Sequence, residues 1–220
     1  MSISVKSIEK LLGETRVGFL NAKGDEEIKG FIGGYGYDDV QLDADIDLRT
    51  RLDDKYQEQQ RLQDEQIIAT RNFDEKYNEE WELLVEFRQL ARVALRDSKY
   101  VGFRLMLGII GKLRRNLEGF LKDGRQFYEN AIKNETIMGL ISKHGITVEK
   151  CQARLTGLDE LKQLDQDQES KKGASQNATK ERDSLYRELR ISWGNFKQVC
   201  RIALKPKRQL LEKLGIVAPS

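Results

Sequence analysis

The sequence is poor in proline, cysteine and histidine, and each shortage narrows the class of protein. Only Pro206 and Pro219 occur among 220 residues, so no proline breaks a helix before Pro206. Two cysteines cannot build a disulfide framework. The single histidine, His144, cannot supply a histidine-based metal site. We therefore expect neither a disulfide-stabilised secreted domain nor a zinc site.

Long apolar runs are also missing. No stretch reaches the roughly 18 apolar residues that a membrane-spanning helix needs. Residues 1–20 lack the basic start, apolar middle and small-residue cleavage site of a signal peptide. We therefore expect no transmembrane segment and a cytoplasmic protein.

Charge and helix-forming residues are abundant. Charged residues make up 34% of the chain and apolar residues 39%, with a net charge of only +2. Residues 38–97 contain no glycine or proline and are rich in good helix formers. A long, charge-rich, proline-poor chain is typical of extended amphipathic helices. The composition predicts an all-α protein.

The sequence contains an internal repeat. A shift of 109 positions aligns residues 12–111 with 121–220 without a gap and gives 24 identities, where chance gives about six. We therefore expect two tandem, pseudo-symmetric helical repeats, 1–111 and 112–220, in a single structural body. Two copies are too few for a solenoid. We also expect equivalent apolar positions to face one another across the pseudo-two-fold axis.

The sequence of each repeat predicts a turn followed by a long helix. Gly36 and Gly145 stand where a helix ends in a left-handed residue, and Asp38 and Thr147 stand where the next helix needs an N-cap. Apolar residues then recur at the alternating three-and-four spacing of a coiled-coil seam. The seam positions are Tyr77, Leu84, Phe87, Ala91 and Ala94 in the first copy, and Tyr186, Trp193, Phe196, Cys200 and Ala203 in the second.

Two architectures fit the long segments, because polar belts at 53–66 and 165–175 interrupt their apolar positions. In the first, each segment is one helix, and the two form an elongated antiparallel bundle or coiled coil with short helices at the ends. In the second, each segment breaks at its belt, giving a compact four-helix bundle of two hairpins. We favour continuous helices. Residues 38–97 carry a net charge of −8 and residues 147–205 a net charge of +3. Opposite charges favour packing of these two segments against each other within one chain.

Each candidate catalytic or metal-binding motif lacks a residue or a structural context that its chemistry requires. The glycines between Gly30 and Gly36 lack the strand–loop–helix context of a phosphate-binding loop. Asp43, Asp45 and Asp47 alternate as in a calcium loop, but Leu48 replaces the turn glycine and no bidentate glutamate follows. Cys151 and Cys200 occupy apolar seam-like positions and are expected to be buried hydrophobes. We expect no catalytic residue, no metal and no cofactor.

Basic residues gather in 98–146, which holds nine basic and four acidic side chains. Such a surface predicts a patch for an anionic partner. The adjacent run Val101–Ile110 either packs into the protein or docks on a membrane as an interfacial helix. The candidate anion-binding residues are Lys112, Arg114, Arg115, Lys122 and Arg125.

The second repeat resembles a group of uncharacterised, mostly helical bacterial proteins with duplicated units. The residues that carry the resemblance are Gly145–Lys150, Ala178–Asp183, Trp193, Phe196, Arg201–Leu204 and Gln209–Ile216. The first repeat is a divergent version, and Val101–Gly111 offers no close match to Gln209–Ile216. The resemblance implies a helical fold and a duplication, and it brings no activity.

The preferred function is that of a non-enzymatic structural or protein-interaction protein. Its partners are expected to be other proteins or a second copy, through 98–146 and through 1–37 with 206–220. The alternative is a binding module for an anionic polymer or a membrane surface through the basic 98–146 region. Nucleic acid is less favoured, because no aromatic-and-basic recognition motif is present.

Overall fold

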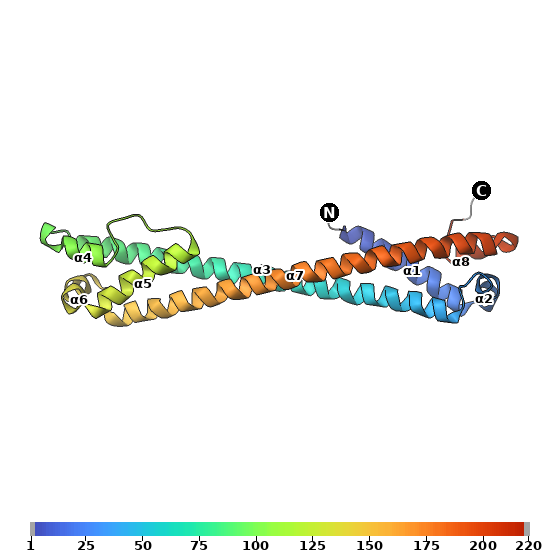
Figure 1. Ribbon diagram of the computed structural model, residues 1–220, viewed down its shortest axis with the longest axis horizontal. Coiled ribbons are helices and arrows are strands. Elements are labelled where there is room, and N and C mark those ends of the chain that lie inside the picture. Colours follow the sequence, from blue (N-terminus) through green and yellow to red (C-terminus); the bar gives the residue numbers. More distant parts are fainter. Residues whose placement is uncertain (1–2, 218–220) are drawn as a thin grey trace. The chain divides into compact units, whose positions relative to one another are not determined.

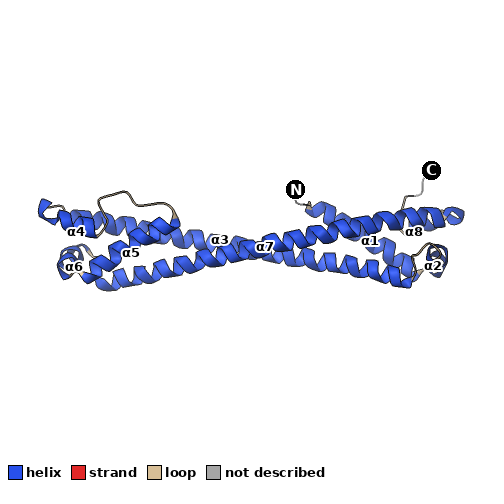
Figure 2. Cartoon of the chain, viewed as in Figure 1, coloured by secondary structure: helices blue, strands red, loops and turns tan. Residues whose placement is uncertain are grey.

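The computed structural model describes residues 3–217, and every regular element in that range is helical (Figure 2). The predicted all-α class is therefore confirmed. Residues 1–2 and 218–220, at the two ends of the expected partner surface 1–37 with 206–220, lie outside the described range.

The two repeats contribute the same series of α-helices, and the second has one additional 3₁₀ turn, η2. The first contains α1 (Val5–Gly24), α2 (Glu26–Gly33), α3 (Asp39–Ala94), the 3₁₀ turn η1 (Ser98–Tyr100) and α4 (Val101–Met106). The second contains α5 (Leu117–Lys133), α6 (Glu135–Ile141), η2 (Ser142–His144), α7 (Val148–Ala203), η3 (Lys205–Lys207) and α8 (Leu210–Lys213). The long helices α3 and α7 begin and end 109 positions apart, at the repeat spacing that the sequence predicted.

Both long segments are single helices of 56 residues that pass through the polar belts, so the hairpin alternative is wrong. The first belt contains no helix breaker and is supported by polar pairs one turn apart, such as Arg61 with Glu65 and Gln59 with Gln63. Gly173, in the second belt, has open space around it and does not interrupt α7.

The predicted caps of the long helices are confirmed. Gly36 and Gly145 have φ angles of 89° and 82°, the left-handed conformation that favours glycine. The Asp38 carboxylate accepts a hydrogen bond from the backbone N–H of Gln41 at 2.9 Å. The Thr147 hydroxyl accepts one from the N–H of Lys150 at 3.3 Å. These side chains satisfy N–H groups that lack a partner within the helix.

The chain forms two compact units, and each contains parts of both repeats. Unit 1 is 1–65 with 172–220, and unit 2 is 66–171. In each unit, half of α3 packs antiparallel to half of α7, and short helices cover them (Figure 1). The boundary between the repeats, at 111/112, lies inside unit 2.

Equivalent apolar positions do not face one another, which corrects the expectation from the repeat. Leu84, Phe87 and Ala91 belong to the core of unit 2, whereas their equivalents Trp193, Phe196 and Cys200 belong to the core of unit 1. The antiparallel arrangement is the reason, because it pairs the second half of one long helix with the first half of the other. All six side chains are buried as predicted. Their partners include α1 or α5 as well as the opposite long helix.

The alignment of the repeats contains a gap after the long helices, contrary to the gap-free alignment above. Gly108 and Gly215 both have positive φ angles, 65° and 66°, and they are 107 positions apart. Each follows a buried leucine and precedes a buried isoleucine, Leu107 with Ile109 and Leu214 with Ile216. The stretch after α3 is therefore two residues longer than the stretch after α7, and Leu107–Ile109 is the match that the sequence comparison missed.

Candidate functional site

A cationic groove lies on unit 2, between the second half of α3 and the chain that follows α4. Its volume is about 370 Å³. The α3 side carries basic and large apolar side chains, and the other side is the segment 110–115. Among the described residues that line the groove, none is acidic. The lining residues are Trp81, Val85, Arg88, Gln89, Arg92, Ile110, Gly111, Lys112, Leu113 and Arg115.

Two arginines one helical turn apart form the α3 side of the groove. Arg88 is only 3% exposed, and its Nη2 donates to the Gly111 carbonyl at 2.9 Å. Arg92 donates from Nε to the Ile109 carbonyl at 2.8 Å and from Nη2 to Gly111 at 3.3 Å. These bonds fix the segment 109–111 against α3. Neither arginine has a carboxylate partner within ion-pair distance among residues 3–217.

The charge of Arg88 is poorly compensated. Burial lowers the pKa of the Arg88 guanidinium, the neighbouring Arg92 lowers it further, and Asp123 opposes both effects. Within the described part of the chain, the Arg88 Nη1 atom is buried with no hydrogen-bond partner. A buried polar group without a partner costs stability. An anion in the groove would relieve the like-charge repulsion between Arg88 and Arg92.

The opposite side of the groove carries Lys112 and Arg115, which are both exposed. The segment is held in place from α3, because the Tyr77 hydroxyl donates to the Arg115 carbonyl at 2.8 Å. Within residues 3–217 neither of these two cations makes an ion pair, so each is available to an anionic ligand.

The other three predicted anion-binding residues do not line the groove. Arg114 makes a bidentate ion pair with Asp123, and Arg125 pairs with Asp159. Their charges are thus compensated. Lys122 is exposed on α5. The sequence placed a basic patch in this region, but only Lys112 and Arg115 of its five candidates line the cationic groove.

Sequence reasoning missed Arg88 and Arg92, because α3 as a whole is acidic. The signal was present in the local spacing. Trp81, Val85, Arg88 and Arg92 succeed one another at steps of four, three and four residues, which places them on one face of a helix. This spacing predicts a helix face that carries two cations next to a large aromatic side chain.

A second group of charged side chains is buried in the core of unit 2. Glu80 is fully buried and accepts a hydrogen bond from Arg154 at 3.2 Å, and Lys76 lies 3.1 Å from its carboxylate. Burial raises the pKa of Glu80, while Lys76 and Arg154 act in the opposite direction. Gly157 leaves the space that Glu80 occupies, since a Cβ there would lie 2.0 Å from Glu80 Oε1. The cluster is a buried ionic contact between α3 and α7 in which, within the described residues, the Glu80 Oε2 atom has no hydrogen-bond partner.

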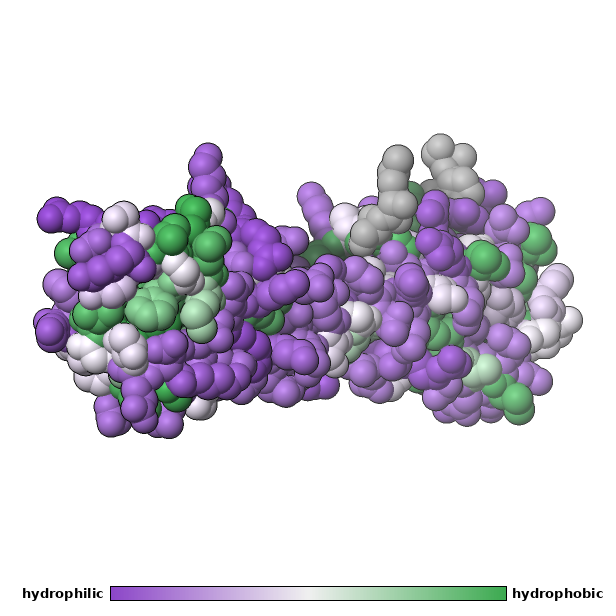
Figure 3. Space-filling model, turned by 60° about the vertical axis from the view of Figure 1, so that its left-hand side comes forward, coloured by the Kyte–Doolittle hydropathy of each residue, from purple (hydrophilic) through white to green (hydrophobic). Residues whose placement is uncertain are grey.

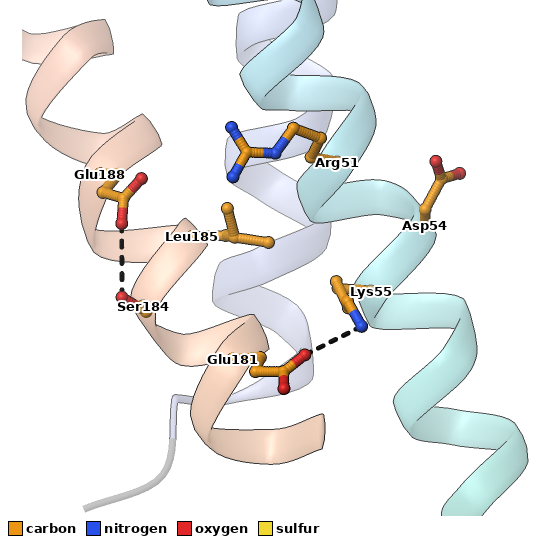
Figure 4. Close-up of a pocket in the computed structure, with 7 residues that line it drawn as sticks. All are labelled: Arg51, Asp54, Lys55, Glu181, Ser184, Leu185 and Glu188. Carbon is orange, nitrogen blue, oxygen red and sulfur yellow. Dashed lines mark hydrogen bonds and ion pairs between the residues drawn. The ribbon is translucent and has the colours of Figure 1, made fainter. Parts of the chain in front are cut away.

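A pocket on unit 1 is shallow and already occupied by ion pairs. Its volume is about 410 Å³, and it lies between α3 and α7 (Figure 4). Lys55 binds Glu181 at 2.8 Å, and the Ser184 hydroxyl donates to Glu188 at 3.3 Å. Figure 4 shows the Arg51 side chain pointing into the space between the helices. The lining thus combines acidic and basic side chains, and Glu181 already pairs with Lys55. Ser184 bonds to a carboxylate one turn away, and the described lining contains no histidine to serve as a catalytic base.

The two cysteines and the alternating aspartates lie in surroundings that explain them without a catalytic or metal-binding role. Both cysteines are buried, and burial raises the pKa of Cys151 to about 11 and that of Cys200 to about 12. Of the three alternating aspartates, Asp45 is buried and accepts a hydrogen bond from Ser192 at 2.7 Å. Asp43 pairs with Lys23, so these two carboxylates have different partners.

An exposed apolar face lies on α4 and the residues after it. It consists of Val101, Leu105, Met106 and Ile110, which are 48, 60, 44 and 55% exposed. Ile110 also lines the cationic groove, so this set of exposed apolar residues extends to the groove along the chain. In Figure 3, hydrophobic surface gathers on the unit 2 part of the view.

Comparisons with protein-family models, with curated proteins and with solved structures find no match to this chain. Within residues 3–217, no helix is both long and apolar enough to cross a membrane.

Proposed function

We propose that this protein is a non-enzymatic binding module that recognises an anionic partner, and that the cationic groove of unit 2 is its binding site. The single observation that carries the proposal is the arrangement of four cationic side chains around one groove whose described lining contains no acidic residue. Arg88 and Arg92 are held in place by carbonyl groups, and Lys112 and Arg115 are exposed opposite them. Preorganised cations bind anions with less loss of side-chain entropy than free ones do.

The sequence alone favoured a protein partner or self-association over an anionic surface. The groove favours the anionic partner instead, because it gathers positive charge in one place. A patch of scattered lysines would spread the same charge over the surface. Arg114 and Arg125, which the sequence counted toward that patch, are neutralised by Asp123 and Asp159. The charge that remains is local, and it faces a defined space.

Heparin, a soluble anionic polymer, is a suitable first probe. Lys112→Gln with Arg115→Gln should weaken binding by roughly three- to thirty-fold, since each exposed ion pair contributes up to about 1 kcal/mol. The matched control is Lys122→Gln with Lys143→Gln, which removes the same charge from exposed positions of unit 2 outside the groove. Binding of the native protein should also fall steeply with salt.

Two results would refute the proposal. One is a native protein that does not bind heparin at low salt. The other is an equal loss of affinity in both double variants, because net charge alone would then explain the binding. Far-UV circular dichroism of each variant establishes that the helices are intact.

A further inference from the structure

The apolar face of α4 is specific to one of the two repeats. With the alignment of 107 positions that Gly108 and Gly215 define, Val101, Leu105 and Met106 correspond to Arg208, Glu212 and Lys213. All six positions are exposed. The second repeat thus carries charged residues where the first repeat carries apolar ones. The same fold is compatible with charged side chains there, so packing does not require Val101, Leu105 and Met106.

The backbone beneath the apolar face is firmly anchored. Arg104 donates to the carbonyls of Leu95 and Arg96 at the end of α3, at 2.9 and 3.0 Å. From α5, Gln126 and Asn130 donate to the Met106 carbonyl at 3.2 and 2.7 Å. These hydrogen bonds and the packing of Phe103 against the core hold α4 in place, while Val101, Leu105 and Met106 remain exposed to solvent.

Charge around the apolar face is of one sign. Residues 98–117 contain five basic and no acidic side chains. Asp97, which precedes this segment, pairs with Lys99, and Asp123 on α5 pairs with Arg114. Glu118, which follows it, is exposed at the start of α5. The apolar residues are thus bordered by the cationic groove, with Ile110 common to both.

We infer that the apolar face of α4 and the cationic groove together dock on an anionic phospholipid bilayer, with the groove receiving a lipid phosphate. The inference depends on the proposed anion-binding function and names its partner. Val101, Leu105, Met106 and Ile110 enter the headgroup region, while Arg88, Arg92, Lys112 and Arg115 bind the phosphate. Apolar burial and attraction to anionic lipid are the two contributions that hold proteins at a membrane surface.

A bilayer fits this surface better than a folded protein does. Four half-exposed side chains offer a few hundred Å², well below the roughly 800 Å² per partner that a stable protein interface buries. A bilayer supplies phosphate groups and an apolar interior side by side over any area. Each basic residue near an anionic membrane raises binding by about fivefold, so a small apolar contact is sufficient.

The test is co-flotation with vesicles of phosphatidylcholine alone and with about 20 mol% phosphatidylserine. The key variant gives the first repeat the residues of the second, Val101→Arg with Leu105→Glu and Met106→Lys. This change adds one net positive charge, so a loss of binding cannot come from weaker electrostatic attraction. The matched control makes the same kinds of change at exposed apolar positions of unit 1, Val40→Arg with Ile191→Glu and Ile202→Lys.

We expect the native protein to bind the anionic vesicles at least tenfold more strongly than the neutral ones. The triple variant in α4 should lose at least tenfold, and the control should bind as the native protein does. Lys112→Gln with Arg115→Gln should lose about twentyfold, two charges at about fivefold each. Leu105→Glu alone replaces the triple variant if circular dichroism shows that the triple variant is unfolded.

Three outcomes would overturn the inference. The first is an absence of binding to anionic vesicles, and the second is undiminished binding by the α4 variants. The third is a native protein that self-associates in light scattering, binds no vesicles and becomes monomeric in the triple variant, since the surface would then bind a second copy. If heparin binding still depends on Lys112 and Arg115 while vesicles are not bound, the proposed function stands and the bilayer inference alone fails.

Discussion

Gly157→Ala tests whether the buried ionic contact of unit 2 controls the packing of α3 against α7. The new Cβ would lie 2.0 Å from Oε1 and 2.6 Å from Cδ of Glu80, far inside the normal contact distance of about 3.5 Å. Glu80 is fully buried, so it cannot turn into solvent. Either the carboxylate leaves Arg154 and Lys76, or the two long helices move apart within unit 2.

The expected effect on the free energy of unfolding combines two opposing contributions. Alanine in a helix interior is favoured over glycine by about 0.5–1 kcal/mol. Overpacking a core costs about 1–3 kcal/mol, and separating a buried charge from its partner costs about 3–5 kcal/mol. Because part of the strain can relax, we expect a net destabilisation of about 2–4 kcal/mol, measured by urea denaturation with far-UV circular dichroism.

Gly173→Ala is the matched control, since it makes the same change in the same helix at a position with nothing within 4 Å. It should stabilise the protein by about 0.5–1 kcal/mol. Introducing Gly157→Ala into a Glu80→Ala background should likewise be neutral or stabilising. If Gly157→Ala alone is as favourable as Gly173→Ala, the packing of Glu80 against Gly157 is not as described.

Two further predictions concern ionisation. Burial raises the pKa of Glu80 above its ordinary value of 4.5, so the folded protein holds this proton more tightly than the unfolded chain. Ionised Glu80 therefore costs stability at pH values above its folded pKa and costs nothing well below 4.5. As pH rises from about 4 to about 7, the unfolding free energy of Glu80→Gln should therefore increase relative to that of the native protein. A difference that does not change with pH would contradict this expectation. Burial also raises the pKa of Cys151 to about 11 and that of Cys200 to about 12. Near pH 8 the native protein should therefore react with a disulfide reagent about 100-fold more slowly at Cys151, and about 1000-fold more slowly at Cys200, than the protein unfolded in urea. Rapid labelling of the native protein would refute the burial of these thiols.

Local features of this fold could be predicted because they depend on nearest neighbours in the sequence. The helix-ending turns at Gly36 and Gly145 and the caps at Asp38 and Thr147 each need a residue type at one position. The course of α3 through its polar belt follows from the absence of glycine and proline there. The repeat likewise required only that the chain be compared with itself.

The candidate site was less accessible to sequence reasoning. A count of basic residues cannot tell a neutralised arginine from an available one, and Arg114 and Arg115 are adjacent in the chain but differ in this respect. Arg114 pairs with Asp123 across a turn, whereas Arg115 faces the cationic groove. Arg88 was overlooked because α3 is acidic on average, although its own face of the helix is not.

The sequence by itself determined the helical class, the duplication, the starts of the long helices and most of the buried seam positions, because helix formation and amphipathicity are encoded at spacings of three and four residues. Three predicted seam positions, Tyr77, Ala94 and Tyr186, are only half-buried. Only the tertiary structure decided that each compact unit joins halves of both repeats, that equivalent seam residues lie in separate cores, and that Val101, Leu105 and Met106 remain exposed. These outcomes depend on contacts between residues far apart in the chain. The sequence pattern of a helix shows that the helix has an apolar face, but it does not show which element covers that face.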